Sequence, residues 1–216
     1  MNWKSIKTVF LDMDGTLLDL HFDNYFWHEF VPLRFSEKHQ IELDDAKQQL
    51  QLRYKSKAGT LDWYCIDYWA HELGLDIPAL KREISTRIQI FPNVEKFLSR
   101  LRQHDKHISL VTNAHRKTLE IKMDYAGIED YFDQIISSHD YGYPKEELLF
   151  WNKLIQVEPF DPATTLFIDD NLAVLSAAEA FGIQHLRSIK RPDSSKPQQD
   201  TKHYLALADF EEIMPK

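Results

Sequence analysis

The most constraining feature of the sequence is a set of short apolar runs that lack the polar alternation of a half-exposed strand. They lie at residues 8–11, 108–111, 134–136 and 165–168, and a weaker run follows at 183–186. Strands that are buried on both faces have this continuous pattern, because neither face meets water. The runs therefore predict a sheet that is covered on both sides.

Helical patterns separate these runs. Asn93, after Pro92, is expected to cap a helix whose apolar face follows at Val94, Phe97, Leu98 and Leu101. Further apolar faces mark residues 148–155 and 172–178, and Gly182 is expected just after the end of the latter. Strands that alternate with helices indicate βαβ units. We therefore predict the α/β class with a Rossmann-like parallel sheet.

Residues 19–90 interrupt this alternation and contain no convincing strand run. Apolar residues recur there at helical spacing in two sets, Leu43, Ala46, Leu50 and Tyr54, then Leu61, Cys65, Tyr68 and Trp69. Pro78 is expected to start a further helix after the turn at Gly74. We predict a core of residues 1–18 and 91–216 and an inserted all-helical domain of residues 19–90, most of which serves packing. The polar, proline-containing residues 191–200 are expected to form an exposed loop.

Composition excludes several classes of protein. The chain carries 26 basic and 34 acidic residues, a net charge of −8, whereas a nucleic-acid binder needs a basic face. Cys65 is the single cysteine, which excludes a disulfide framework or a Cys-rich zinc site and suits a reducing compartment. The sequence shows neither a membrane-length apolar run nor a signal peptide. We expect a cytoplasmic protein without nucleic-acid or membrane partners.

An acidic motif follows the first predicted strand directly. It reads Asp12-Met13-Asp14-Gly15-Thr16. Ligands of open parallel sheets bind at the carboxyl ends of the strands, and two aspartates one residue apart can both face that edge. Gly15 allows a turn with unusual dihedrals or a close backbone approach. A plain Asp-Gly turn is the alternative explanation.

Three further polar clusters follow other predicted elements in chain order. They are Thr112 with Asn113, Lys145 within residues 143–146, and the pair Asp169 and Asp170. Each has an ordinary explanation by itself, such as a structural threonine, a solvated lysine or a capping aspartate. Together with Asp12 and Asp14 they are expected to share one edge of the sheet.

This ordered set resembles the four motifs of the haloacid dehalogenase superfamily of phosphotransferases. The resemblance implies that residues 19–90 form a mobile cap of the C1 type over the core. It implies that Asp12 is the nucleophile and a metal ligand, and that Asp14 is the general acid and base whose carbonyl touches the metal. It also assigns phosphate binding to Thr112, Asn113 and Lys145. The third motif departs from the usual Lys-Pro-x-Pro, because the stretch reads Tyr143-Pro144-Lys145-Glu146-Glu147 here.

The resemblance makes Asp169 and Asp170 further metal ligands. It aligns Asp170 with the acid that ligates the ion directly and Asp169 with its neighbour, which often acts through water, and it leaves an exchange of these two roles open. Electrostatics supports a cation, because a carboxylate about 3.5 Å from a phosphate dianion is repelled by roughly 9 kcal/mol at an effective dielectric near 20. Oxygen donors of this kind suit Mg²⁺, and Lys145 adds positive charge. With an ordinary pKa of about 3.9, Asp12 is expected to be ionised without tuning.

Asp14 favours a phosphate ester as the substrate. An alcohol that leaves needs a proton, which Asp14 can supply, while Asp12 can form an aspartyl-phosphate. Relatives that release halide lack an acid at this position, and those that cleave phosphonates differ there as well. The motif thus predicts a Mg²⁺-dependent phosphomonoesterase that acts on a small molecule.

Two stretches, residues 11–24 and 57–65, resemble bacterial GMP/IMP nucleotidases. Because the second lies in the predicted cap, we expect purine nucleoside 5′-monophosphates as substrates, with Trp63 and Tyr64 the first choices for base stacking. A sugar-phosphate or phosphoglycolate phosphatase is the alternative enzyme, and a non-catalytic binding module on the same fold is the alternative from another class. The basic run at residues 52–57 indicates a solvated helix end, and a cationic contribution to the binding of an anionic substrate is the alternative. The oligomeric state is not indicated.

Overall fold

A six-stranded, entirely parallel sheet forms the core of the protein, as described by a computed structural model that covers residues 1–216. The strand order is β3-β2-β1-β4-β5-β6. The strands are β1 (Thr8–Leu11), β2 (His107–Thr112), β3 (Gln134–Ser137), β4 (Thr165–Ile168), β5 (His185–Ile189) and β6 (Ala206–Leu207). The predicted α/β class and parallel sheet are confirmed.

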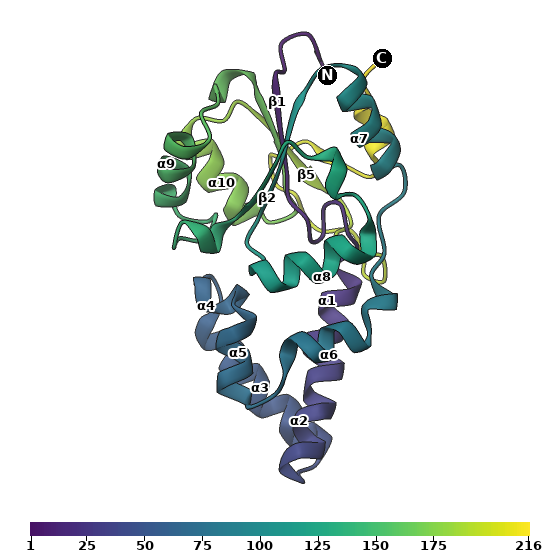
Figure 1. Cartoon of the computed structure of the whole chain (residues 1–216), viewed down its shortest axis with the longest axis vertical. Helices are drawn as coiled ribbons and strands as arrows, with labels where there is room; N and C mark the ends of the chain where they lie inside the picture. The colour runs from purple at the N-terminus through teal and green to yellow at the C-terminus, as the bar shows by residue number, and fades with distance from the viewer.

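Helices cover both faces of this sheet (Figure 1). They are α7 (Val94–Gln103), α8 (Arg116–Ala126), α9 (Leu148–Val157) and α10 (Leu172–Phe181), with 3₁₀ turns η3 (Glu129–Tyr131), η4 (Ser138–Asp140), η5 (Pro162–Thr164) and η6 (Phe210–Ile213). Val9 and Leu11 of β1 pack in the apolar cluster with α7 and α8, whereas Phe10 packs with α9 and α10. Burial on both faces explains why β1 reads as an unbroken apolar run.

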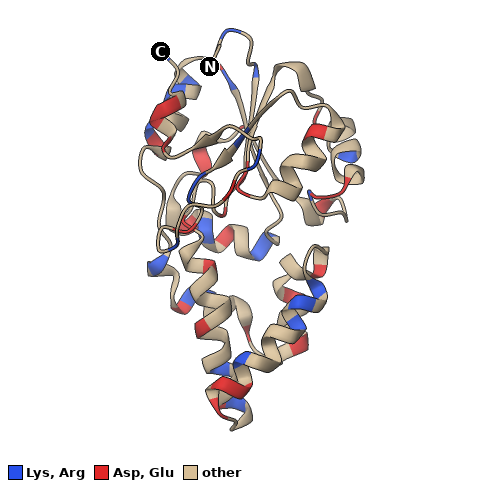
Figure 2. Cartoon of the chain, turned by 180° about the vertical axis from the view of Figure 1, so that it is seen from behind, with Lys and Arg blue, Asp and Glu red and all other residues tan.

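The helices between β1 and α7 form a second body that projects from the carboxyl edge of the sheet (Figure 1). They are α1 (His21–Tyr25), the π-helical η1 (Phe26–Phe30), α2 (Val31–His39), α3 (Leu43–Lys57), α4 (Leu61–Tyr64), α5 (Ile66–Leu73), α6 (Ile77–Glu83) and the 3₁₀ turn η2 (Ser85–Arg87). We call these residues, 21–87, the helical body. It has its own apolar cluster around Phe26 and Trp69. Basic and acidic residues are interspersed along its helices (Figure 2).

Three local predictions differ from the structure. Asn93 precedes α7 but has a left-handed backbone (φ 61°) and makes no side-chain cap, because its amide donates instead to Asp209 at 3.0 Å. Cys65 divides the second predicted helical set into α4 and α5. The last predicted strand begins at His185 rather than Ile183, because Ile183 is an apolar loop residue that is buried between α10 and the sheet. Pro78 does lie in the first turn of a helix, α6, as predicted.

The prediction that residues 191–200 form an exposed loop is wrong in part. Asp193 is only 4% exposed and accepts hydrogen bonds from Asn24 at 2.6 Å and from the hydroxyl of Ser195 at 2.6 Å. Gln199 donates to the carbonyl oxygen of Asp170 at 3.0 Å. Most of the segment is exposed as predicted, but Asp193 and Gln199 bond within the protein, so the polarity of these two residues does not indicate contact with water. No helix of the chain combines the length and the apolar character that a bilayer crossing requires.

Candidate active site

The predicted site residues converge at the carboxyl edge of the sheet. β1 lies between β2 and β4, and the chain crosses from one side of β1 to the other after β3, which makes this edge a topological switch point. A cavity of about 460 Å³ opens there and is lined by residues of the core and of the helical body. Its volume falls within the range of about 300–1,000 Å³ that is typical of small-molecule sites.

Three carboxylates meet at the floor of the cavity. Asp12 follows β1, and Asp169 and Asp170 follow β4. Since Leu11 and Ile168 are register partners in the sheet, Asp12 and Asp169 leave adjacent strands side by side. Oxygen atoms of the three carboxylates lie within 4.8 Å of one another. An all-oxygen set at this spacing fits a hard divalent cation such as Mg²⁺.

Lys145 reaches the same carboxylates from the loop before α9. Its ammonium is buried and donates to Asp12 at 2.5 Å, to Asp169 at 2.7 Å and to the carbonyl oxygen of Val111 at 2.9 Å. Burial by itself lowers the pKa of Lys145, but the two carboxylates outweigh burial and the net shift is upward. The lysine is therefore a fixed positive charge, although the sequence of its motif is unusual for the family it resembles.

Burial raises the pKa of Asp12 to about 7, and the Asp169 carboxylate adds to this rise against the attraction of Lys145. Burial and the neighbouring carboxylates also raise the pKa of Asp170. The expectation that Asp12 is ionised without tuning is therefore wrong. A cation beside a carboxylate favours its charged form, so these groups need positive charge beyond that of Lys145.

Gly15 is required at this site for two reasons. Its backbone has φ +77°, which disfavours residues with a side chain, and a Cβ there would lie 2.6 Å from a carboxylate oxygen of Asp170. The turn and the close approach predicted from the sequence both occur.

Asp14 belongs to a buried chain of ion pairs that the sequence analysis missed. Lys122 of α8 donates to Asp14 at 2.5 Å and to Asp23 of α1 at 2.5 Å. Lys81 of α6 donates to the other oxygen of Asp23 at 2.9 Å. Both lysine side chains are 1% exposed, and this series of ion pairs extends from the core to the helical body. A lysine on the apolar face of α8, beside Leu119, was the sequence signal for it.

These ion pairs give Asp14 and Asp23 different pKa values. Burial raises the pKa of Asp14 to about 6, with Lys122 opposing the rise and Asp23 adding to it. Burial also acts to raise the pKa of Asp23, but Lys122 and Lys81 together lower it to about 2. A carboxyl group with a pKa near 6 can give and take protons close to neutral pH, whereas Asp23 stays charged.

The residues after β2, Thr112 and Asn113, support the loop that carries Lys145. The hydroxyl oxygen of Thr112 accepts from the backbone of Ala114 at 3.0 Å. Asn113 accepts from the backbone N–H of Lys145 at 2.9 Å and donates to Glu146 at 2.8 Å. Thr112 and Asn113 both line the cavity, and the side chain of Asn113 holds the loop that carries Lys145.

The helical body supplies the other wall of the cavity. Trp27, His28, Trp63 and Tyr64 line it, together with Asn24. Trp27 and Trp63 each pack edge-on against Tyr54, with ring centroids 5.8 Å apart. The Tyr64 hydroxyl donates to Glu146 of the core at 2.6 Å. Trp63 and Tyr64 are the two residues expected from the sequence, whereas Trp27 was not singled out and the contact with Glu146 was not predicted.

Comparisons with known proteins agree with this geometry. A family model described as haloacid dehalogenase-like hydrolase matches residues 6–182. The chain is 38% identical over 213 residues to GMP/IMP nucleotidase YrfG of Escherichia coli (strain K12), covering 99% of this chain and 96% of that protein. It is 23% identical to (S)-2-haloacid dehalogenase of Pseudomonas sp. (strain YL), over 82% of this chain and 80% of that protein. The crystal structure of a HAD phosphatase from Thermococcus onnurineus superposes with a TM-score of 0.81 at 22% identity, covering 96% of each chain.

Proposed function

The chain belongs to the haloacid dehalogenase-like hydrolase family, and we propose that it hydrolyses purine nucleoside 5′-monophosphates, with GMP and IMP as preferred substrates. The family resemblance and the class of phosphoric monoester hydrolase are confirmed. The observation that carries the substrate proposal is a single cavity lined both by the carboxylate–lysine cluster and by the aromatic wall of the helical body. The 38% identity to the nucleotidase supports it, because it extends over the helical body as well as the core.

In the proposed reaction, Asp12 attacks phosphorus and forms an aspartyl-phosphate while the bond to the ester oxygen breaks. Lys145, which contacts Asp12 at 2.5 Å, holds the attacking carboxylate and offsets the negative charge around the phosphoryl group. Water then hydrolyses the aspartyl-phosphate, releasing inorganic phosphate and restoring Asp12.

Asp14 is the proposed proton shuttle. Its carboxyl group donates a proton to the departing nucleoside oxygen and, once charged, takes a proton from the attacking water. Lys122 positions Asp14 through the 2.5 Å contact and stabilises its charged form after the first step. We propose Thr112 and Asn113 as phosphate-binding residues beside Lys145.

Asp12, Asp170 and the backbone carbonyl of Asp14 are the proposed holders of Mg²⁺, with Asp169 beside them. Asp169 already accepts from Lys145 at 2.7 Å and from the backbone of Asn171 at 2.8 Å. The Asp170 carboxylate accepts no hydrogen bond from the protein, which favours it as the direct ligand. When bound, Mg²⁺ supplies positive charge that offsets the repulsion between these carboxylates and the phosphate.

We propose that the helical body acts as the cap that selects the leaving group. Its cavity wall carries indole and phenol rings suited to stacking on a purine, and Asn24 and His28 add polar groups. A sugar-phosphate or phosphoglycolate phosphatase would have no use for this aromatic wall. A non-catalytic binding module would have no use for a proton shuttle at Asp14.

The experiment is phosphate release from GMP, IMP, CMP, UMP, ribose 5-phosphate and phosphoglycolate, with Mg²⁺ and with a chelator. We expect the purine nucleotides to exceed the others in kcat/KM by about five- to 150-fold, the equivalent of about 1–3 kcal/mol of stacking. Equal turnover of ribose 5-phosphate or phosphoglycolate would refute the purine proposal. No Mg²⁺-dependent turnover of any ester would favour the binding module.

A further inference from the structure

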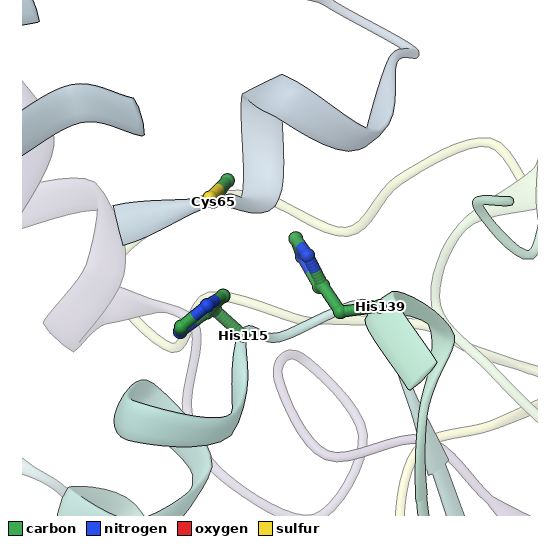
Figure 3. Close-up of side chains that lie close together, drawn as sticks. All are labelled: Cys65, His115 and His139. Atoms are coloured by element: carbon green, nitrogen blue, oxygen red, sulfur yellow. The ribbon is translucent and has the colours of Figure 1, made fainter. Parts of the chain in front are cut away.

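A second group of side chains of the types that ligate metal ions lies where the helical body meets the core (Figure 3). Cys65 lies between α4 and α5, His115 precedes α8, and His139 lies in η4 after β3. The thiol sulfur and one nitrogen from each imidazole lie within 4.8 Å of one another. The group therefore takes one donor from the helical body and two from the core.

The protein uses the donors of this group only in part. The Cys65 sulfur accepts a hydrogen bond from the backbone N–H of Tyr68, and Nδ1 of His115 accepts one from the backbone N–H of Lys117, each at 3.4 Å. Nε2 of His139 is shielded from solvent and has no hydrogen-bond partner, which is uncommon for a buried polar atom. Nε2 of His115 lies 3.7 Å from the Asp67 carboxylate, which is too far for a hydrogen bond. The two imidazole rings are 5.0 Å apart and nearly perpendicular, at 80°.

The protonation states of both histidines suit coordination. Burial lowers the pKa of His115. Burial, with the neighbouring His115, lowers the pKa of His139 to about 4. Both shifts favour the neutral imidazole, which is the form that binds a metal ion.

We propose that Cys65, His115 and His139 form a binding site for a borderline-soft divalent ion, Zn²⁺ before others, which ties the helical body to the core. Zn²⁺ binds sulfur at about 2.3 Å and imidazole nitrogen at about 2.0–2.1 Å. Three tetrahedral ligands are then about 3.3–3.7 Å apart, so donors that lie within 4.8 Å of one another need to approach by at most about 1.5 Å. Water or Asp67 can take the fourth position, and the thiol gives up its proton to the solvent on binding.

This site differs in chemistry and in location from the carboxylate cluster. The cluster at Asp12 offers only oxygen and suits Mg²⁺, whereas a thiol with two imidazoles suits Zn²⁺. The second site adjoins the cavity, since Trp63 and Tyr64 before Cys65, and Ala114 before His115, line it. Bound Zn²⁺ would restrain the helical body at the cavity wall and so reduce kcat/KM for nucleotides, a consequence that rests on the proposed function.

The direct test is titration of the reduced protein with Co²⁺ in excess Mg²⁺, followed by near-ultraviolet absorption. A cobalt–thiolate charge-transfer band must come from Cys65, because the chain has no other cysteine. We expect the band to appear with one equivalent of Co²⁺, to vanish when Zn²⁺ displaces it, and to be absent from Cys65→Ser. His139→Gln is expected to weaken Co²⁺ binding at least about tenfold.

His104→Gln is the matched control, because it makes the same change at the C-cap of α7, outside the cluster. Its band and affinity should equal those of the wild type, and circular dichroism checks that each variant is folded. No band in the wild type, or full affinity in both His139→Gln and His115→Gln, would overturn the proposal. The readout requires no turnover, so a normal band in a protein that fails to hydrolyse nucleotides would overturn only the proposed function.

Discussion

The core and the helical body place their cavity residues in different ways. In the core, Asp12 and Asp169 each come one residue after the register partners Leu11 and Ile168, so backbone pairing fixes their separation. In the helical body, Trp63 lies on a four-residue helix and depends on packing against Tyr54 and Trp69. The sheet thus sets a rigid geometry for phosphate chemistry, whereas the helices can change their lining residues without disturbing it.

The largest expected effect lies in the core. Asp12→Asn should abolish turnover of every ester, because an amide cannot form the aspartyl-phosphate. We expect a loss of kcat above about a thousandfold, well within the acceleration that enzymes supply. The matched control is Asp105→Asn, an exposed residue with φ 51° that asparagine also adopts readily, and it should keep full activity. Residual turnover of Asp12→Asn above about one-thousandth of wild type would point to another nucleophile.

Asp14→Asn separates proton transfer from nucleophilic attack within the core. Loss of a general acid typically costs about 10²–10⁴-fold, and we expect a loss in this range of kcat/KM for IMP, whose nucleoside leaves poorly. p-Nitrophenyl phosphate should lose much less, because its leaving group needs little protonation. Equal losses on both esters would contradict the proton-shuttle role of Asp14.

The junction of the two regions is tested by Asp23→Asn. The change leaves the buried ammonium groups of Lys81 and Lys122 with less negative charge, and breaking a buried pair costs about 3–5 kcal/mol of unfolding free energy. Urea unfolding at neutral pH measures it. Asp62→Asn is the control, because it breaks the partly exposed pair with Lys57, and a solvent-accessible pair is worth about 0–1 kcal/mol. If Asp23→Asn lost as little unfolding free energy as Asp62→Asn, the buried ion pairs would add no stability.

The sequence predicted the core better than the junction, for a physical reason. Strand burial and motif order are local signals, so the positions of Asp12, Gly15 and Asp170 relative to the sheet could be predicted. The contact between Asp23 and Lys122 joins residues 99 positions apart, and no local pattern indicates which buried lysine meets which carboxylate. The raised pKa of Asp12 was missed because burial depends on the packed site rather than on the residue.

The roles of two polar residues were also predicted wrongly from the sequence. Asn93 has the composition of a helix cap, yet its amide bonds to Asp209, 116 positions away. Asp193 lies in a proline- and serine-containing segment that reads as solvated, yet it is buried against α1. In both cases a distant partner decides the role of the side chain.

We propose a division of roles in which the core performs the chemistry and the helical body selects the purine. Its most direct test is kcat/KM for IMP and for p-nitrophenyl phosphate in the wild type and in Trp63→Ala, with folding checked by circular dichroism. We predict that the ratio of IMP to p-nitrophenyl phosphate falls about five- to 150-fold in the variant, because stacking worth about 1–3 kcal/mol is lost while the core is unchanged. An equal fall for both esters, or no change for either, would contradict this division of roles.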